Sequence, residues 1–162
     1  MKTTQIVRKT ADQTTNICID TISREKQGLV FCASKRAAES QAEKVAKATD
    51  KNKQQQKTEW DEIGEKALHT LSQPTQQCKR LAYCLKRGVA FHHAGLPSKQ
   101  RELIEEAFRE GNITIICSTP TLAAGLDLPA FRTIIRDYKR FSGRAMAPIP
   151  VLEYLQMAGR AG

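Results

Sequence analysis

The sequence predicts an α/β fold built on a mostly parallel sheet with helices on both faces. Short, wholly apolar runs such as residues 28–32 and 113–117 alternate with longer segments of helical periodicity. Parallel strands need crossover connections, and helices in those connections cover both faces of the sheet. The 162 residues are 40% hydrophobic and 27% charged, which is typical of one domain that buries its own core.

The first unit is expected to be a helix, a strand and a second helix. Residues 16–26 place apolar side chains on one helical face, and residues 28–32 form a continuous apolar run typical of a buried strand. Ser34 is a suitable N-cap for the helix predicted over residues 35–48.

Two polar segments are expected to lie outside these elements. Residues 1–15 predict a flexible N-terminal segment, so that the domain spans residues 16–162. Residues 47–57 contain no hydrophobic side chain after Ala48, which predicts a solvated loop or a frayed helix end.

Helices and strands continue to alternate in the rest of the chain. Gly88 and Gly111 suit the left-handed position that follows a helix. In chain order the sequence predicts helices over 59–71 and 74–88, a strand over 89–91, a helix over 98–110, strands over 113–117 and 133–135, and a helix over 151–157.

The net charge of +9, from 26 Lys and Arg against 17 Asp and Glu, favours a polyanionic partner. A basic surface that serves solubility accounts equally well for the charge alone. The five cysteines are not spaced as metal ligands and are expected to be buried thiols, so no metal site is predicted. The chain shows neither a signal peptide nor a membrane span, and a cytoplasmic, intracellular protein is expected.

Ligands of parallel α/β sheets bind at the carboxyl ends of the strands. Ser34, Lys35 and Arg36 follow the first strand, where backbone N–H groups and two cations suit a phosphate. A helix cap followed by solvated cations explains the same residues. After the second strand come His92 and His93, which point to different sides and so do not predict zinc; they suit either a contact to nucleic acid or a packed turn.

Hydroxyl side chains and an acidic residue follow the third strand. Thr119 and Thr121 lie where a helix begins, which suits the oxygens of a nucleic-acid backbone. Gly125 permits close approach of another group, and Asp127 offers a carboxylate to a ribose hydroxyl or to a water near a metal. A helix cap followed by a turn is the plainer interpretation.

Two further segments carry candidate residues. Arg160 lies between glycines near the end of the chain, where it suits a transferring phosphoryl group or belongs to a flexible basic terminus. Residues 136–150 alternate aromatic and basic side chains around a Ser-Gly turn and then carry prolines, which predicts a protruding β-hairpin.

Taken together and in order, these segments resemble superfamily 2 helicases of the Ski type, and among them the archaeal Hjm/HELQ-like DNA repair helicases. The resemblance covers about residues 28–162. It rests on FHHAGL, on R-x-x-I-E-x-x-F-x-x-G from Arg101 to Gly111, on STPTLAAGLDLPA and on QMAGRAG.

The resemblance implies a RecA-like fold and the second of two motor domains, with ATP bound between them. It implies that Gly125 and Asp127 of motif V contact the nucleotide and that motif VI faces the triphosphate. The motif VI residues are Gln156 and Arg160, which would be both catalytic and nucleotide-binding. In this chain we find no Walker A lysine and no acidic box, so the phosphate cradle and the Mg²⁺ ligands are expected on the first RecA-like domain.

The resemblance also implies movement along single-stranded or forked DNA in the 3′ to 5′ direction. The residues expected to contact nucleic acid are Ser34, Lys35, Arg36, His93, Thr119, Thr121, Tyr138, Arg140 and Phe141. The last three lie in the predicted hairpin, which in these helicases wedges the duplex open, so that Tyr138 or Phe141 would stack on a base there. A surface hairpin that packs on its own domain is the plainer alternative.

The sequence departs from the family where motif VI would carry a second arginine, because it ends at Gly162. The domain is therefore expected to be truncated within motif VI and inactive in isolation. Two alternatives remain open, an RNA helicase of the same superfamily and a non-catalytic RecA-like adaptor.

Overall fold

The structure, a computed structural model, describes residues 3–50, 58–120, 122, 128–137, 139–141, 145–148 and 151–161. Its centre is a parallel sheet that contains, within these residues, four strands in the order β2-β3-β1-β4. The strands are β1 (Gly28–Phe31), β2 (Val89–His92), β3 (Ile115–Ser118) and β4 (Arg132–Ile135). Gly28 of β1 lies opposite Ile115 on one side and Arg132 on the other, so the carboxyl ends of the strands meet at one edge.

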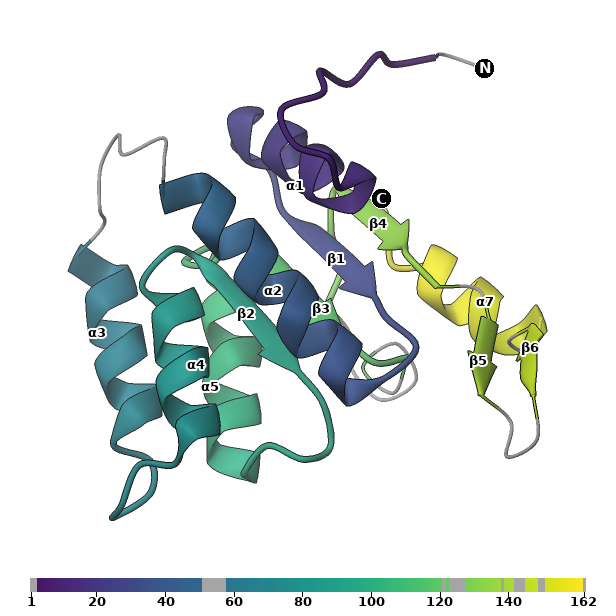
Figure 1. Ribbon diagram of the computed structural model, residues 1–162. Helices are drawn as coiled ribbons and strands as arrows, with labels where there is room; N and C mark the ends of the chain where they lie inside the picture. Colours follow the sequence, from purple (N-terminus) through teal and green to yellow (C-terminus); the bar gives the residue numbers. More distant parts are fainter. Residues whose placement is uncertain are drawn as a thin grey trace.

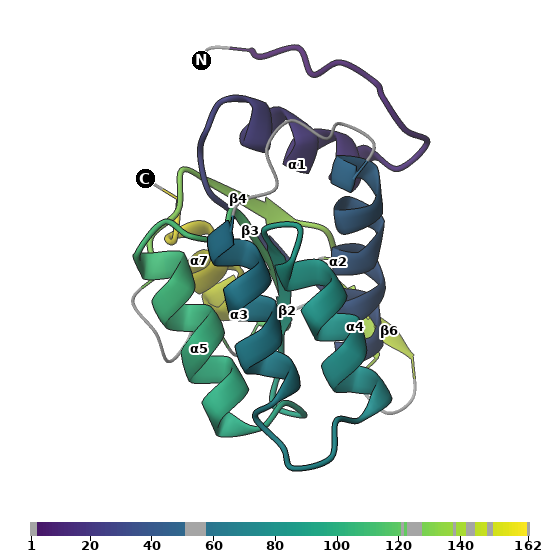
Figure 2. The same cartoon turned by 90° about the vertical axis from the view of Figure 1, so that its left-hand side faces the viewer.

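Helices cover both faces of this sheet, as predicted. The described helices are α1 (Gln13–Ser23), α2 (Lys35–Asp50), α3 (Thr58–Leu68), α4 (Gln76–Leu85), α5 (Ser98–Arg109) and α7 (Val151–Ala158). Figure 1 shows α1 and α2 in front of the sheet. Figure 2, which looks onto the β2 edge, shows α5 and α7 on the opposite side from α2, with α3 and α4 nearest the viewer.

The core lies between these layers and is almost wholly apolar. Every residue of β1, β2 and β3 is buried, as expected for strands covered on both faces. Phe31, Phe91 and Phe108 are at most 1% exposed, and each such side chain contributes roughly 1.5–3 kcal/mol by leaving water. All five cysteines are buried free thiols, which confirms that prediction.

The first helix begins earlier than predicted, because α1 starts at Gln13 rather than at residue 16. The Asp12 carboxylate caps the helix by accepting a hydrogen bond from the Thr15 N–H at 3.0 Å. The Asn16 side chain accepts hydrogen bonds from the N–H groups of Lys9 and Thr10. Part of the segment expected to be flexible is therefore hydrogen-bonded to the first helix.

Other element boundaries shift by a few residues. The helix α2 continues to Asp50, beyond the predicted end at residue 48, while residues 51–57 lie outside the described part of the chain. The strand β3 begins at Ile115 rather than at residue 113, since Thr114 N–H bonds to the Gly88 carbonyl, which precedes β2. Gly88 and Gly111 both have φ of +77°, which confirms the predicted left-handed stops.

The predicted hairpin is present as two antiparallel strands, β5 (Lys139–Phe141) and β6 (Met146–Pro148). It stands apart from the main sheet in Figure 1. Among the described residues, no helix has the length and apolar character needed to cross a membrane.

Candidate nucleic-acid and nucleotide site

The loops that follow β1, β2 and β3 lie side by side at the carboxyl edge of the sheet. Cys32 N–H donates to the Ser118 carbonyl at 2.8 Å, and Thr119 N–H donates to the His92 carbonyl at 3.4 Å. The sheet therefore brings the residues predicted from three separate segments to one edge.

The turn between β1 and α2 presents two cations at a helix N-terminus. The Ser34 hydroxyl accepts a hydrogen bond from the Ala37 N–H at 3.1 Å, which makes Ser34 the N-cap. Lys35 and Arg36 are exposed in the first turn of the 16-residue helix α2. The positive end of the helix dipole and these two side chains attract an anion to the same place.

His93 was expected to contact nucleic acid, but the structure buries its side chain at 1% exposure. Its Nδ1 accepts a hydrogen bond from the Gly95 N–H at 3.0 Å, so the proton lies on Nε2 and is donated to Glu39 Oε1 at 2.8 Å. The ring also stacks on Phe91. Both ring nitrogens are used inside the protein, and His93 belongs to a packed turn, the alternative that the sequence left open.

Glu39 holds this turn against two helices. Besides His93, its carboxylate accepts hydrogen bonds from Gln77 Nε2 at 3.1 Å and from Arg80 Nη1 at 2.7 Å, both on α4. Burial disfavours the charged carboxylate, but the hydrogen bonds from His93 and Gln77 and the charge of Arg80 hold the pKa of Glu39 below its ordinary value. The charge on Glu39 is thus part of the structure of the carboxyl edge.

His92 is buried separately and pairs with Glu105 of α5, with 2.8 Å between Nε2 and Oε1. Burial lowers the pKa of His92, although the Glu105 carboxylate opposes the shift. As expected, the two adjacent histidines point to different partners.

Only part of the predicted motif V segment lies among the described residues. Thr119 is half-buried directly after β3, while Thr121, Gly125 and Asp127 lie outside the described residues. Leu122 and Leu128 are at most 2% exposed, so the chain is fixed to the core directly before and directly after residues 123–127.

Arg160 lies at the other end of the sheet. Its carbonyl accepts a hydrogen bond from the Ala130 N–H at 2.9 Å, and Ala161 forms a bridge with Ala130, which precedes β4. Gln156 is exposed on α7, one turn before Arg160, whereas Met157 between them is fully buried. The candidate residues therefore form two groups, one at the carboxyl edge and one on α7 and the turn that follows it, beside the chain that leads into β4.

Comparison with known protein families matches residues 9–162 to the helicase conserved C-terminal domain. The chain belongs to this family. Its relatives include the protein named ATP-dependent DNA helicase Hel308 in three archaea. The Methanocella arvoryzae protein is 46% identical over 93% of this chain, that of Methanococcus vannielii is 44% identical over 91%, and that of Pyrococcus horikoshii is 45% identical over 88%.

These relatives confirm the resemblance inferred from the motifs. The matched part of the chain corresponds to 20%, 20% and 19% of their respective lengths, so the chain spans about a fifth of each relative. The helicase C-terminal domain is what the comparison establishes for this chain.

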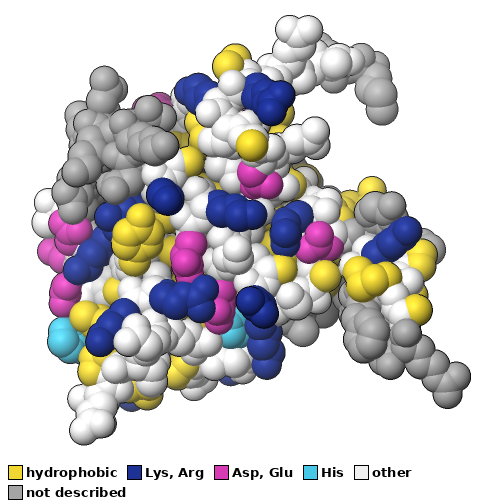
Figure 3. Space-filling model, in the orientation of Figure 1, with side chains coloured by type: hydrophobic (Ala, Val, Ile, Leu, Met, Phe, Trp, Pro, Cys, Tyr) yellow, Lys and Arg dark blue, Asp and Glu magenta, His cyan; other side chains and the backbone are white. Residues whose placement is uncertain are grey.

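The hairpin of this helicase C-terminal domain is described in part. Arg140 pairs with Ala147 and Phe141 with Met146 along the backbone, while Tyr138 lies outside the described residues. In the face shown in Figure 3, Lys and Arg side chains are spread over the surface and interspersed with Asp and Glu. The net positive charge is thus distributed on this face rather than gathered in one patch.

The sequence patterns did not single out two residues that lie at the carboxyl edge, Glu39 and Asp137. Glu39 lies on the face of α2 that is otherwise formed by Ala38, Ala42 and Val45, and a charge on an apolar helix face was the available signal. Asp137 accepts a hydrogen bond from the Ala33 N–H at 2.9 Å, a contact that joins residues far apart in the sequence and leaves no local pattern.

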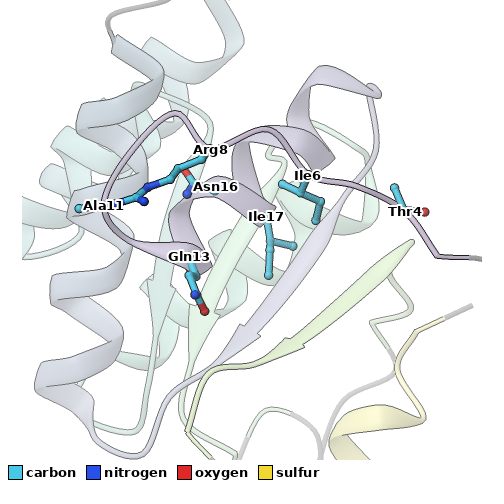
Figure 4. A pocket seen from close by; sticks show the side chains of 7 residues that line it. All are labelled: Thr4, Ile6, Arg8, Ala11, Gln13, Asn16 and Ile17. Atoms are coloured by element: carbon cyan, nitrogen blue, oxygen red, sulfur yellow. The ribbon is translucent and has the colours of Figure 1, made fainter.

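A shallow hollow lies between the N-terminal segment and α1 (Figure 4). None of the predicted site residues lines it. Its lining is Thr4, Ile6, Arg8, Ala11, Gln13, Asn16 and Ile17.

Proposed function

We propose that this chain is the second motor domain of an ATP-dependent DNA helicase that moves 3′ to 5′ along single-stranded or forked DNA. In this proposal ATP binds between this domain and a first RecA-like domain of the same polypeptide. The observation that carries it is the family match over residues 9–162, together with relatives named as DNA helicases.

The exposed cations after β1 support binding of a nucleic-acid backbone at the carboxyl edge. Lys35 and Arg36 lie at the N-terminus of α2, and Thr119 follows β3 at the same edge. Backbone phosphates carry no base sequence, so binding is expected to be independent of sequence and sensitive to salt.

The position of α7 supports a separate role in the nucleotide site. Arg160 is half-buried in a turn whose backbone is hydrogen-bonded to Ala130. The backbone position from which its side chain extends is therefore held in place. We infer that Arg160 and Gln156 face the triphosphate, with Gly125 and Asp127 contributing from motif V. A fixed guanidinium suits a phosphate that gains charge during phosphoryl transfer. The carboxylates that hold Mg²⁺ are expected on the first domain.

The proposal is tested by strand separation. A longer protein that carries both RecA-like domains is expected to unwind a forked DNA duplex with a 3′ single-stranded tail, and not one with a 5′ tail. Equal-sequence RNA forks provide the comparison, since a preference for RNA would indicate the RNA helicase alternative. A protein that separates neither fork but binds another protein tightly would indicate the adaptor.

A further inference from the structure

The carboxylate of Asp137 continues the hydrogen-bond ladder between β1 and β4 by one rung. The last backbone rung is the hydrogen bond from Arg136 N–H to the Phe31 carbonyl at 3.1 Å. At the next position, Asp137 Oδ2 accepts from the Ala33 N–H at 2.9 Å, where a strand would offer a backbone carbonyl. A side chain therefore ties the two loops together where the strands end.

The charge of Asp137 suits this place. Arg136 Nη1 lies 3.2 Å from the same carboxylate oxygen, and the bonded N–H belongs to the residue directly before the N-cap of α2. An anion near a helix N-terminus is stabilised by the helix dipole. The side chains of Arg136 and Asp137 are 30% and 28% exposed, so the pair is partly solvated and its loss leaves no deeply buried charge.

The two ends of this contact lead into different functional segments. Ala33 directly precedes Ser34, Lys35 and Arg36, the turn expected to hold the DNA backbone. Asp137 lies two residues before Lys139, where β5 of the hairpin begins. The contact therefore fixes the base of the β5–β6 hairpin relative to the turn that is expected to hold the DNA backbone.

We propose that Asp137 is a positioning residue that couples duplex separation by the hairpin to movement of the gripped strand. This inference rests on the proposed helicase function. A hairpin that separates the two DNA strands must keep its position relative to the turn that binds the DNA backbone while the protein moves along the DNA. Asp137 supplies that link through an oxygen acceptor, and the backbone ladder of β1 and β4 maintains the fold without it.

The test compares unwinding with ATP hydrolysis in a protein that carries both RecA-like domains. Asp137→Ala is expected to slow unwinding of a forked duplex about tenfold, equivalent to roughly 1.4 kcal/mol, while single-stranded-DNA-stimulated ATPase stays within about twofold. Asp137→Asn keeps an oxygen acceptor and is expected to unwind within about threefold of the unmodified protein. Glu102→Ala, which removes an exposed carboxylate on α5, is the matched control.

Two results would overturn the inference. Unwinding that is unaffected by Asp137→Ala shows that the contact does not couple the segments. An equal loss of ATPase and unwinding shows that it serves the fold or the ATP cycle instead. If the unmodified protein shows neither activity, the proposed function fails rather than the contact.

Hydrogen exchange on the 162-residue chain tests the contact without catalysis. Asp137→Ala is expected to raise amide exchange at Ala33 and along β5 and β6, and to leave exchange in α2 unchanged. Unchanged exchange in the hairpin would contradict the link directly.

Discussion

Among the described residues at the carboxyl edge of this sheet, Glu39 joins several elements through a single side chain. It accepts hydrogen bonds from His93, Gln77 and Arg80 and so joins α2, α4 and the turn after β2. Its pKa is held below the ordinary value of 4.5. The charged form is therefore the one that the fold requires.

Removing Glu39 is expected to cost more than removing its neighbour. Glu39→Ala leaves a buried imidazole N–H without an acceptor and is expected to destabilise the chain by about 2–4 kcal/mol. Glu43→Ala, which breaks only a half-exposed pair with Arg80, is expected to cost at most about 1 kcal/mol. Urea unfolding followed by the fluorescence of Trp60, the single tryptophan, measures both. Equal costs would contradict the role of Glu39.

His92 predicts a loss of stability at mildly acidic pH. Its folded pKa lies below the ordinary value of 6.5, so the unfolded chain binds a proton more readily. The contribution of His92 to the free energy of unfolding is therefore fully present above pH 6.5. It decreases as the pH is lowered, by up to about 1.4 kcal/mol per pH unit, until the folded pKa is reached. His92→Gln keeps a donor for Glu105 and is expected to flatten the profile between pH 7.5 and 5. A variant with the same slope would assign the effect to other groups.

At the scale of elements, two glycines provide a matched pair. Gly88 and Gly111 both have φ of +77°, but a Cβ on Gly88 would lie 2.5 Å from Trp60 Cζ2, whereas one on Gly111 meets nothing within 4 Å. Gly111→Ala is expected to cost about 1 kcal/mol for its backbone alone. Gly88→Ala is expected to cost a further 1–3 kcal/mol or so and to shift the Trp60 emission. Equal costs in urea unfolding would show that Trp60 moves aside freely.

The sequence predicts the elements better than their ends. Strands β1, β2 and β3 were found because strands buried on both faces must be wholly apolar. The start of α1 was missed because it depends on the cap at Asp12, and the start of β3 because it depends on the carbonyl of Gly88. Such boundaries are set by contacts rather than by periodicity.

The same distinction applies to the candidate site. Lys35, Arg36 and Thr119 were placed correctly at the carboxyl edge, because strand order alone decides which residues follow a strand. The burial of His93 could not be predicted, since it depends on Glu39 and Gly95, residues brought together only by the fold.

At the scale of the whole molecule, the net charge of +9 and the cations of the carboxyl edge predict salt-sensitive binding of single-stranded DNA. Lys35→Ala and Arg36→Ala are each expected to weaken binding of single-stranded DNA to the same extent for unrelated DNA sequences. Each is also expected to reduce the slope of the logarithm of the binding constant against the logarithm of the salt concentration by about 0.7. Lys79→Ala, on exposed α4 surface, is the control. Fluorescence anisotropy against salt concentration measures both; an unchanged slope in both variants would place the DNA elsewhere.

The proposed motor role of this chain is tested by single-stranded-DNA-stimulated ATPase activity in a protein that joins this domain to a first RecA-like domain and extends beyond Gly162. Arg109→Ala, which removes an exposed arginine of α5, is the control. We expect stimulated hydrolysis that falls by about a hundredfold or more in Arg160→Ala and is unchanged in the control. Hydrolysis that survives the loss of Arg160 would contradict its place in the nucleotide site, and hydrolysis that is absent from the joined protein would contradict the assignment of this chain as a motor domain.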